Sequence, residues 1–458
     1  MADIREFDVV VLGAGPAGEV AAGRLGENGL SVVIVERELV GGECSYHACV
    51  PSKALLRPHQ ALAEARRVPG AAEAARGELD VGAVLRRRDD VIGHLDDASQ
   101  LPWLEQRSVA LVRGHGKLVA EREVSVGEER LHARRAVILA PGSTAAIPPI
   151  PGLREAVPWT NREATTAGSV PSSLLVLGGG VVGVEMADAY ASLGARVTVV
   201  EAAPRLIAGE EEFASELVRA SLEGKGAEVL LGVRAGAVRR ESPGGPVALE
   251  LEDGRSVIGE ELLVAVGRQA RTDALGLESL GLEGGQPIEV DEAMRVPGHD
   301  WLYVVGDANG RALLTHMGKY QARLAADDIL GRPVELRSDG AMVPRVIFTE
   351  PQVAAIGHTL ASAREAGLNV RAVDQPVGGN AGGRYIGIGA PGSVRIVVDE
   401  DRRVLVGATF TGVEVAESLH AATIAVIGEV PLERLWHAVA CFPTRSEVWL
   451  RLLEAYGL

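Results

Sequence analysis

Short runs of apolar residues, each followed by glycine, recur along the first two thirds of the chain. The first run spans residues 7–12 and leads into a turn and a helical segment that ends near Gly29. A second apolar run, residues 31–35, ends at Glu36. The turn contains three glycines, Gly13, Gly15 and Gly18. Because buried parallel strands are continuously apolar, the pattern predicts a strand, a glycine turn, a helix and a second strand.

The same unit recurs in the middle of the chain. An apolar run at 174–177 precedes a helix that ends near Gly194, and a strand at 196–200 ends at Glu201. Its glycines are Gly178, Gly180 and Gly183. The first glycine and the acid are 23 positions apart in both copies, 36 minus 13 and 201 minus 178. In such units the glycines allow a tight turn, close approach to a pyrophosphate and helix packing, while the acid binds a ribose.

Two dinucleotide sites are therefore predicted. At the second site Glu201 stands where a basic residue would bind a 2'-phosphate, which favours NAD(H) over NADP(H). Arg205, four positions further on, is the one observation against this preference.

The remaining pattern divides the chain into an α/β part and a mixed terminal part. Strands and helices alternate to about residue 330, and the prolines of 148–152 mark a crossover between domains. An apolar strand at 302–305 ends in Gly306 and Asp307, where the acid is placed to bind flavin hydroxyl groups. After about residue 342 the expected elements are strands at 343–348, 394–399 and 405–410 and helices at 361–366, 414–427 and 446–455.

Composition narrows the possible functions. The 458 residues are enough for about three domains, and a net charge of -16 argues against nucleic-acid or anionic-membrane partners. The first strand begins at residue 7, which leaves no room for a signal peptide, and no apolar run is long enough to cross a membrane. We therefore expect a cytoplasmic protein that acts on small molecules.

Cys44 and Cys49 are the strongest chemical signal in the chain. They begin eight residues after Glu36, and Cys441 is the only other cysteine, so a structural disulfide framework is excluded. Cysteines five positions apart on a helical turn can form an accessible, labile disulfide of the catalytic kind. The alternative is a pair of reduced, buried thiols.

Together these features resemble the flavoprotein disulfide reductases, and among them the dihydrolipoamide dehydrogenase branch. The resemblance rests on both glycine units, on the cysteine pair followed by Pro51-Ser52-Lys53, on Gly306-Asp307 and on the segment 348–357. It covers essentially the whole chain. It implies an α/β, glutathione-reductase-like fold with an FAD domain at 1–148 and 270–338, a nicotinamide domain at 149–269 and a dimer-interface domain at 339–458.

The resemblance also implies a reaction in which NADH reduces FAD, and FAD reduces the Cys44–Cys49 disulfide of a homodimer. Cys49 would be the thiol next to the flavin, Cys44 would attack a small-molecule acceptor, and Lys53 would pair with Glu185. The cofactor contacts implied are Gly13, Gly15, Gly18, Glu36, Gly42, Lys53, Gly116, Gly142, Asp307, Thr315, Gly178, Gly180, Gly183, Glu201 and Gly267. No metal site is expected.

One position departs from the pattern of the family. Most members have a histidine before the Pro-Thr near the C-terminus, which forms an acid/base dyad with a glutamate five residues later. Here the histidine position is Phe442, whereas Glu447 is retained. Since an acid/base group contributes about 10² to 10⁴ in rate, ordinary lipoamide is not the expected acceptor. His47, His437 or Tyr46 could replace the base, and Cys441 is either an electron relay or a buried structural thiol.

Two rarer branches share the aromatic residue. Mercuric reductase also has a C-terminal cysteine pair, which is lacking here because the chain ends at 454–458 without cysteine. The 2-ketopropyl-coenzyme M oxidoreductase/carboxylase branch replaces the glutamate of the dyad as well, whereas this chain keeps it as Glu447. The motifs also fit an NADH-dependent quinone or dye reductase, or a redox-responsive binding protein without turnover.

Overall fold

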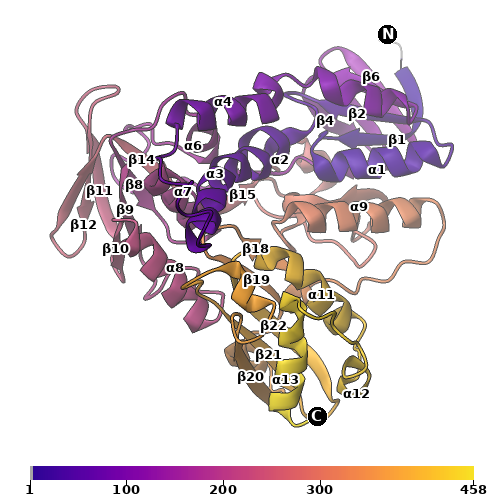
Figure 1. Ribbon diagram of the computed structural model, residues 1–458. Helices are drawn as coiled ribbons and strands as arrows, with labels where there is room; N and C mark the ends of the chain where they lie inside the picture. The colour runs from indigo at the N-terminus through magenta and orange to yellow at the C-terminus, as the bar shows by residue number, and fades with distance from the viewer. Residues whose placement is uncertain (1–3) are drawn as a thin grey trace. The chain divides into compact units, whose positions relative to one another are not determined.

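The computed structural model describes residues 4–458, and the chain divides into two compact units. The first unit contains the chain up to Pro51 together with 88–146 and 268–340. The second unit contains 52–87, 147–267 and 341–458. Figure 1 shows the elements of both units, coloured from indigo at the N-terminus to yellow at the C-terminus.

The first unit is built on a mostly parallel sheet. Its strand order is β16-β17-β6-β1-β2-β3, with parallel pairing from β17 to β3 and an antiparallel β16 at the edge. The strands are β1 Ile4–Leu12, β2 Val32–Glu36, β3 Val109–Arg113, β6 Glu129–Leu139, β16 Arg295–Val296 and β17 His299–Val304. The pair β4 Gly116–Ala120 and β5 Glu123–Val126 extends from β6 as an antiparallel hairpin. The central strands are apolar on both faces because both faces are covered.

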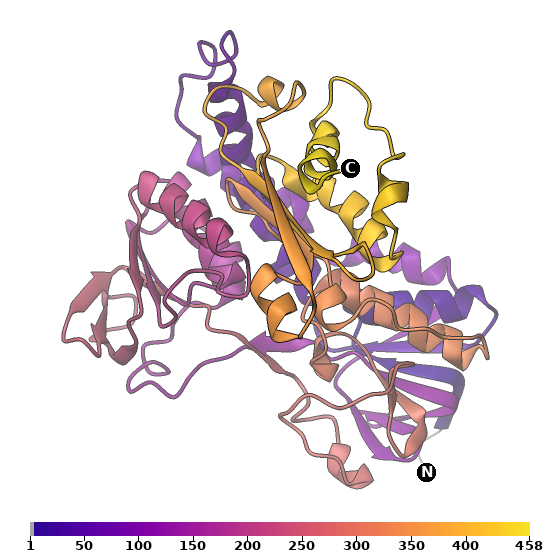
Figure 2. The ribbon, with the colours of Figure 1, turned by 90° about the horizontal axis from the view of Figure 1, so that it is seen from below.

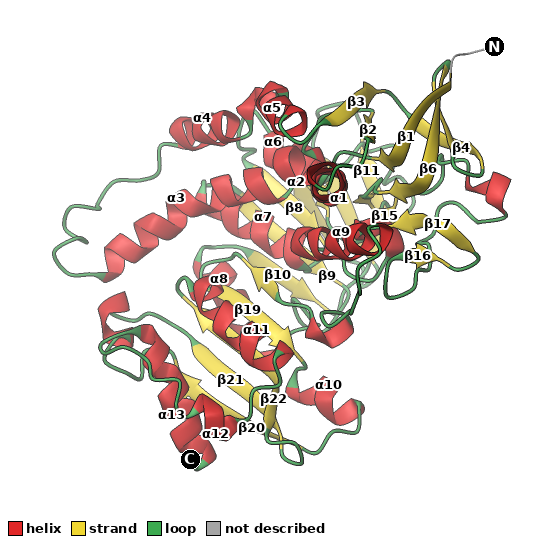
Figure 3. Ribbon diagram, turned by 90° about the vertical axis from the view of Figure 1, so that its right-hand side faces the viewer, coloured by secondary structure: helices red, strands yellow, loops and turns green. Residues whose placement is uncertain are grey.

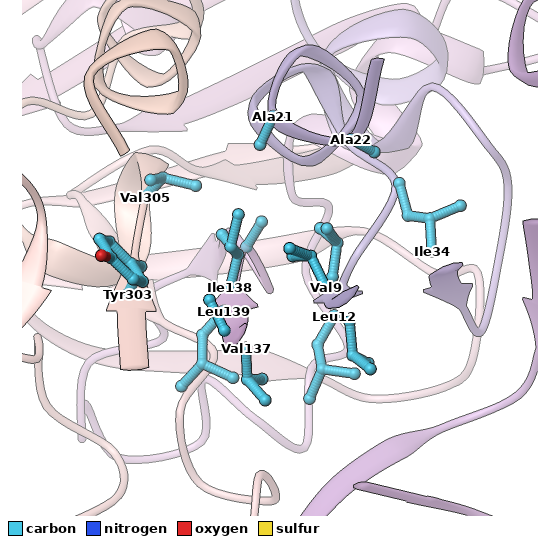
Figure 4. Close-up of a cluster of buried hydrophobic side chains, with 14 of the residues drawn as sticks. Val9, Leu12, Ala21, Ala22, Ile34, Val137, Ile138, Leu139, Tyr303 and Val305 are labelled. Carbon is cyan, nitrogen blue, oxygen red and sulfur yellow. The ribbon is translucent and has the colours of Figure 1, made fainter. Parts of the chain in front are cut away.

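Helices α1 Pro16–Glu27 and α9 Thr315–Ile329 pack against each other in this unit. Ala21 and Ala22 of α1 lie over the sheet next to Val9 and Ile138 (Figure 4). Small side chains bring the helix backbone close to the strands, so the turn between β1 and α1 is held rigidly. The other helices of the unit are α2 Gly42–His47, the start of α3 Cys49–Arg67, the end of α4 Val81–Val91 and α5 Leu101–Glu105, and β7 Ser143–Ala145 pairs with β15 Arg268–Ala270.

The second unit contains another parallel sheet, of order β10-β9-β8-β14. Its strands are β8 Ser173–Leu177, β9 Arg196–Glu201, β10 Glu228–Leu231 and β14 Glu261–Val264. The associated helices are α6 Asn161–Thr166, α7 Val181–Ser192 and α8 Glu212–Gly224, and β11 Ala235–Arg240, β12 Val247–Leu251 and β13 Ser256–Gly259 form an antiparallel sheet. Leu55 and Leu56 of α3 are buried in the same core as Val184 of α7.

The C-terminal part of the second unit is a five-stranded antiparallel sheet of order β18-β19-β22-β21-β20. The strands are β18 Arg345–Ile347, β19 Gln352–Gly357, β20 Val370–Pro376, β21 Ser393–Asp399 and β22 Val404–Gly412. Helices α11 Leu419–Ile427 and α13 Val448–Tyr456 share the core of one face, the yellow helices beside the orange sheet in Figure 2. Helices α10 Leu360–Glu365 and α12 Leu432–Leu435 complete this part (Figure 3).

The strands predicted at 394–399 and 405–410 are present, whereas β19 and β20 were not predicted. The helix predicted at 414–427 begins only at Leu419. Its predicted first residue, Glu414, has a left-handed φ of 50° and is followed by a short 3-10 turn over Val415–Ser418. A right-handed helix cannot include a left-handed residue, so α11 starts after this turn.

Candidate active site

The dithiol lies at a break between two helices. Cys44 is in α2 and Cys49 begins α3, and the intervening Ala48 has non-helical φ and ψ of -139° and -98°. Both sulfurs belong to half-buried thiols, and the Cys44 thiol hydrogen bonds to Cys49. The Cys49 Sγ also lies 3.3 Å from Oγ1 of Thr315, the first residue of α9. The structure thus places three residues from the predicted site in one cluster.

The electrostatics of the cluster distinguish the two sulfurs. The hydrogen bond to Cys49 and burial raise the pKa of the Cys44 thiol well above its usual range, and the charge on Cys49 acts in the same direction. Thr315 and the Lys319 ammonium group lower this pKa but do not outweigh the rise. Cys44 is therefore the sulfur that holds a proton when the neighbouring sulfur is negatively charged.

The first glycine turn leaves an open, backbone-lined cradle at the start of α1. Gly13 has a φ of 104°, and a Cβ atom on Gly18 would lie 1.9 Å from the Gly13 carbonyl oxygen, so neither position accepts a side chain. A Cβ on Gly42 would lie 2.7 Å from Cα of Gly15. Glu36, at the end of β2, accepts hydrogen bonds from the backbone N–H groups of Ala14 and Glu38, both at 2.7 Å. Such a helix N-terminus fits the pyrophosphate of FAD.

The second glycine turn repeats this geometry. A Cβ atom on Gly183 would again lie 1.9 Å from a glycine carbonyl oxygen, that of Gly178, which has a φ of 110°. Glu201 accepts hydrogen bonds from Gly179 N–H and, at 2.6 Å, from Ala203 N–H. A Cβ on Gly180 would meet no atom within 4 Å, so the space in front of this turn is open. This cradle fits a second dinucleotide, a nicotinamide cofactor.

Asp307 and its neighbours form a polar cluster at the end of the first sheet. Asp307 accepts a hydrogen bond from the Ser143 hydroxyl group, and Arg268 Nε donates to the same hydroxyl at 2.6 Å. Gly142, with a φ of 72°, lies just before β7, and Gly267, with a φ of 143°, lies just before β15. Gly116 has a packing role instead, since a Cβ there would lie 2.6 Å from a Leu12 methyl group.

Lys53 and Glu185 form a close ion pair in the second unit. Lys53 Nζ lies 2.6 Å from Glu185 Oε2, although the two residues are 132 positions apart. The other oxygen of Glu185 accepts the backbone N–H of Phe348 at 2.9 Å, and the Lys53 ammonium lies 4.6 Å from the centroid of the Phe348 ring. Lys53 follows Cys49 by four residues in the same helix, α3.

A second acid on α7 was missed in the sequence. Asp188 is fully buried, lies 3.2 Å from His59 Nε2, pairs with Lys225 and accepts the backbone N–H of Glu350 at 2.9 Å. Burial alone would raise the pKa of Asp188, but the hydrogen bonds and charges of His59 and Lys225 outweigh it and lower the pKa. Burial raises the pKa of Glu350, although Arg67 pairs with it. Glu185 and Asp188 are three positions apart and so lie on one face of α7, and this spacing is the sequence feature that could have identified Asp188.

The C-terminal position that departs from the family is exposed. The Phe442 side chain is 76% exposed, and its peptide bond to Pro443 is cis. Glu447 is half-buried, and its Oε2 has no hydrogen-bond partner within the described range 4–458. Cys441 is an exposed thiol, so the expectation of a buried structural cysteine is wrong in this chain taken alone.

The three residues considered as replacement bases lie in different surroundings. His437 is exposed, and His47 is half-buried at the end of α2. Tyr46 is buried, and burial raises its pKa to about 12. A phenol with that pKa keeps its proton at neutral pH, so Tyr46 does not serve as a base there.

Comparison with known proteins gives a consistent result over the whole chain. The family described as pyridine nucleotide-disulphide oxidoreductase matches residues 7–322, and the dimerisation domain of that family matches 343–452. A dihydrolipoyl dehydrogenase from Thermus scotoductus is 33% identical, over 99% of this chain and 98% of the relative. One from Haloferax volcanii is 31% identical, over 98% and 95%, and a mercuric reductase from Staphylococcus aureus is 28% identical, over 96% and 81%.

Two solved structures share the fold. The HOCl-induced flavoprotein disulfide reductase RclA from Escherichia coli, in its Cu(II) complex, superposes with a TM-score of 0.86 at 23% identity, over 97% of this chain and 99% of the other. LpdA from Mycobacterium tuberculosis superposes with a TM-score of 0.86 at 24% identity, over 99% and 100%. These likenesses confirm the predicted α/β, glutathione-reductase-like fold.

The two nucleotide cradles and the dithiol define an NAD(P)H-dependent flavoprotein oxidoreductase, an enzyme class that uses FAD. The chain belongs to the pyridine nucleotide-disulphide oxidoreductase family and contains its dimerisation domain. Between residues 4 and 458, no helix is both long and apolar enough to span a bilayer. The same residues contain no cluster of three or more potential metal-ligating side chains.

Proposed function

We propose that this enzyme takes electrons from NADH and passes them, through a redox-active Cys44–Cys49 pair, to a small acceptor other than ordinary lipoamide. The observation that carries the proposal is the contact between the Cys44 and Cys49 thiols, with Thr315 Oγ1 3.3 Å from Cys49 Sγ. When bound, FAD would accept the hydride equivalent and reduce the disulfide. The first cradle, with Gly15, Gly42 and Glu36, would hold this cofactor.

The two thiols have different roles in this proposal. Cys44 keeps its proton next to a negatively charged Cys49, which supports Cys49 as the sulfur beside the flavin and Cys44 as the one that attacks the acceptor. Lys53, one turn from Cys49, is held by Glu185 at 2.6 Å, and it would present a positive charge to the reduced site.

The nicotinamide site supports a preference for NADH over NADPH. Glu201 occupies the end of β9 with its carboxylate fixed by two backbone N–H groups, and a 2'-phosphate there would meet a negative charge. The Arg205 guanidinium keeps its positive charge, but it donates to the carbonyls of Ala208 and Glu210, both at 2.6 Å, so these donors are already used. Arg205, which in the sequence argued against an NADH preference, therefore forms its hydrogen bonds within its own loop.

Phe442 determines which acceptors remain efficient. We propose a homodimer in which the partner's C-terminal segment reaches the acceptor side of the dithiol, as the dimerisation domain at 343–452 supports. A phenyl ring cannot protonate a leaving thiolate, whereas quinones, dyes, metal ions and oxygen take electrons without releasing a thiol. The absence of a histidine at 442 therefore slows disulfide exchange, whereas the rates at which the other acceptors are reduced stay almost unchanged.

The substitution Phe442→His tests this proposal. With an imidazole at 442 and Glu447 retained, we expect lipoamide reduction to rise by about 10² and quinone reduction to change less than about twofold. The matched control is Phe442→Leu, which removes the ring without adding a base and should leave lipoamide reduction low. Steady-state NADH oxidation with each acceptor measures both. Equal lipoamide rates in the two variants would show that a missing base is not what restricts the acceptor.

A further inference from the structure

The loop at 202–211 packs directly on the second glycine turn. It connects β9, which ends at Glu201, to helix α8. The backbone N–H of Ile207 donates to the carbonyl of Gly179 at 2.8 Å, and a Cβ atom on Gly179 would lie 2.5 Å from a Leu206 methyl group. Gly179 in turn donates its N–H to the Glu201 carboxylate. A movement of this loop is therefore transmitted to the turn and to the acid that would bind a ribose.

Ile207 has a backbone conformation that isoleucine rarely adopts. Its φ of 41° lies in the left-handed region, where a β-branched residue is a genuine outlier. Its side chain is buried, as is that of the preceding Leu206. Backbone strain of this kind persists only where the surrounding contacts fix the conformation. The loop at 202–211 therefore depends on contacts that are strong enough to keep Ile207 in place.

Two ion pairs anchor the end of this loop to the C-terminal sheet. Glu210 accepts two hydrogen bonds from the guanidinium group of Arg345 in β18, at 2.6 and 3.0 Å. Glu211 lies 2.9 Å from Arg395 of β21 and accepts the backbone N–H of Leu360 at 2.8 Å. The two carboxylate side chains are only 10% and 6% exposed, so salt screens these pairs weakly. The arginines follow their partners by 135 and 184 positions, so they hold the loop from outside the glycine unit.

Both arginines are themselves fixed by further contacts. Arg345 also donates to the carbonyl of Gly357 at 3.2 Å. Asp374 accepts two hydrogen bonds from Arg395, at 2.7 and 2.8 Å, and the Arg395 guanidinium lies 5.2 Å from the centroid of the Phe213 ring in α8. A guanidinium group held in several directions loses little further freedom when a cofactor binds nearby, so the ion pairs are preorganised.

We infer that Arg345 and Arg395 are positioning residues for the adenosine half of the nicotinamide cofactor. Their ion pairs keep the loop at 202–211 in the form that places Gly179 and Glu201 to receive the ribose. The inference rests on the proposed nicotinamide site, and it makes the affinity of that site depend on two residues of the C-terminal sheet. When a pair is broken, Ile207 can relax, and only molecules that keep the original loop bind the cofactor. The apparent Kd is then the intrinsic Kd divided by the fraction of such molecules.

Calorimetric titration of the FAD-loaded enzyme with ADP-ribose tests the inference. This probe contains the adenosine and pyrophosphate of the cofactor, lacks the nicotinamide ring and carries no electrons. Arg345→Met breaks the pair with Glu210, and if about a tenth of the molecules keep the original loop, the Kd should rise about tenfold. Arg345→Lys retains a positive charge and should recover part of this loss. Arg239→Met is the matched control, because Arg239 forms an exposed pair with Glu250 at 3.0 Å in the same unit, and it should bind ADP-ribose like wild type.

A double-mutant cycle shows whether the effect passes through the ion pair. Glu210→Gln alone should also weaken ADP-ribose binding, and the double variant Arg345→Met/Glu210→Gln should bind no more weakly than the more affected single variant. The flavin absorbance should stay unchanged in all of them. Arg395→Met breaks the second pair and gives an independent measurement if Arg345→Met does not fold.

An unchanged Kd in Arg345→Met and Arg395→Met, or fully additive losses in the double variant, would overturn the inference. A wild-type enzyme that binds no ADP-ribose would instead overturn the proposed nicotinamide site on which the inference rests. Because the probe transfers no electrons, neither result depends on the proposed role of the dithiol.

Discussion

The buried Asp188 network gives the sharpest stability prediction. Asparagine at 188 keeps the side-chain shape and can still accept the Glu350 N–H at 2.9 Å, but it cannot neutralise Lys225 or pair with His59. Removing one partner of a buried ion pair costs about 3–5 kcal/mol. The Lys225 side chain is 24% exposed and regains some hydration when Asp188 is replaced. We therefore expect Asp188→Asn to destabilise this region by about 3 kcal/mol, the lower end of that range. That corresponds to roughly two powers of ten in the opening equilibrium of this region.

Hydrogen exchange of peptides from α7 is the appropriate assay, because a chain with two units need not unfold in a single step. Asp253→Asn in the same unit is the matched control, since Asp253 forms an exposed pair with Arg255 and should alter protection little. The same protection of α7 in Asp188→Asn and wild type would refute the reasoning.

The pH dependence of this effect has a definite sign. The folded-state pKa of Asp188 is lowered, so its contribution is fully present above the unfolded value of 3.8 and is lost as the pH falls through the folded value. The difference between wild type and Asp188→Asn should therefore stay constant from neutral pH down to about 4, and shrink only in stronger acid. A difference that shrinks already between pH 7 and pH 5 would contradict the assignment to Asp188.

Three further predictions concern the cofactor cradles and the ion pair beside the dithiol. Gly183→Ala should abolish nicotinamide binding in a titration calorimeter, because its Cβ would lie 1.9 Å from a carbonyl oxygen. Gly224→Ala, at the end of α8, is the control for an added methyl group, because a Cβ there would meet no atom within 4 Å. Glu201→Ala should lower the preference for NADH over NADPH by about tenfold in kcat/KM, and no change would remove Glu201 from the specificity argument. Glu185→Gln should weaken any long-wavelength absorbance of the reduced enzyme, since Lys53 loses its carboxylate at 2.6 Å; an unaltered spectrum would separate this pair from the dithiol.

The glycine units were predictable because every requirement in them is local. Gly13 needs its φ of 104°, Gly18 meets a carbonyl oxygen five residues earlier, and Glu36 folds back onto the turn, all within one short segment. The second unit repeats these constraints with the same spacing. Sequence reasoning therefore predicted both turns and their acids without any knowledge of distant contacts.

Contacts between distant segments could not be predicted in this way. Glu185 meets Lys53 across 132 positions, and only the family resemblance implied the pair. Asp188 joins His59, Lys225 and the backbone of Glu350, which come from three other segments with no shared spacing.

Of the two strands that were not predicted, β19 was missed for a related reason. Strand β19, Gln352–Gly357, contains two alanines and is buried at every position, so it shows neither alternation nor a β-branched run. Its strand character comes from pairing with β18 and β22 on both sides. In such segments tertiary pairing, rather than local propensity, determines the structure.

The central claim is that Cys44 and Cys49 exchange electrons with the flavin. The most direct test is an anaerobic titration of the FAD-loaded enzyme with NADH, followed by absorbance, beside a Cys49→Ser variant. After one equivalent, wild type should develop a long-wavelength charge-transfer band that the variant lacks. Direct bleaching of the wild-type flavin to the fully reduced form, with no such band, would contradict the account and leave the thiols outside the reaction.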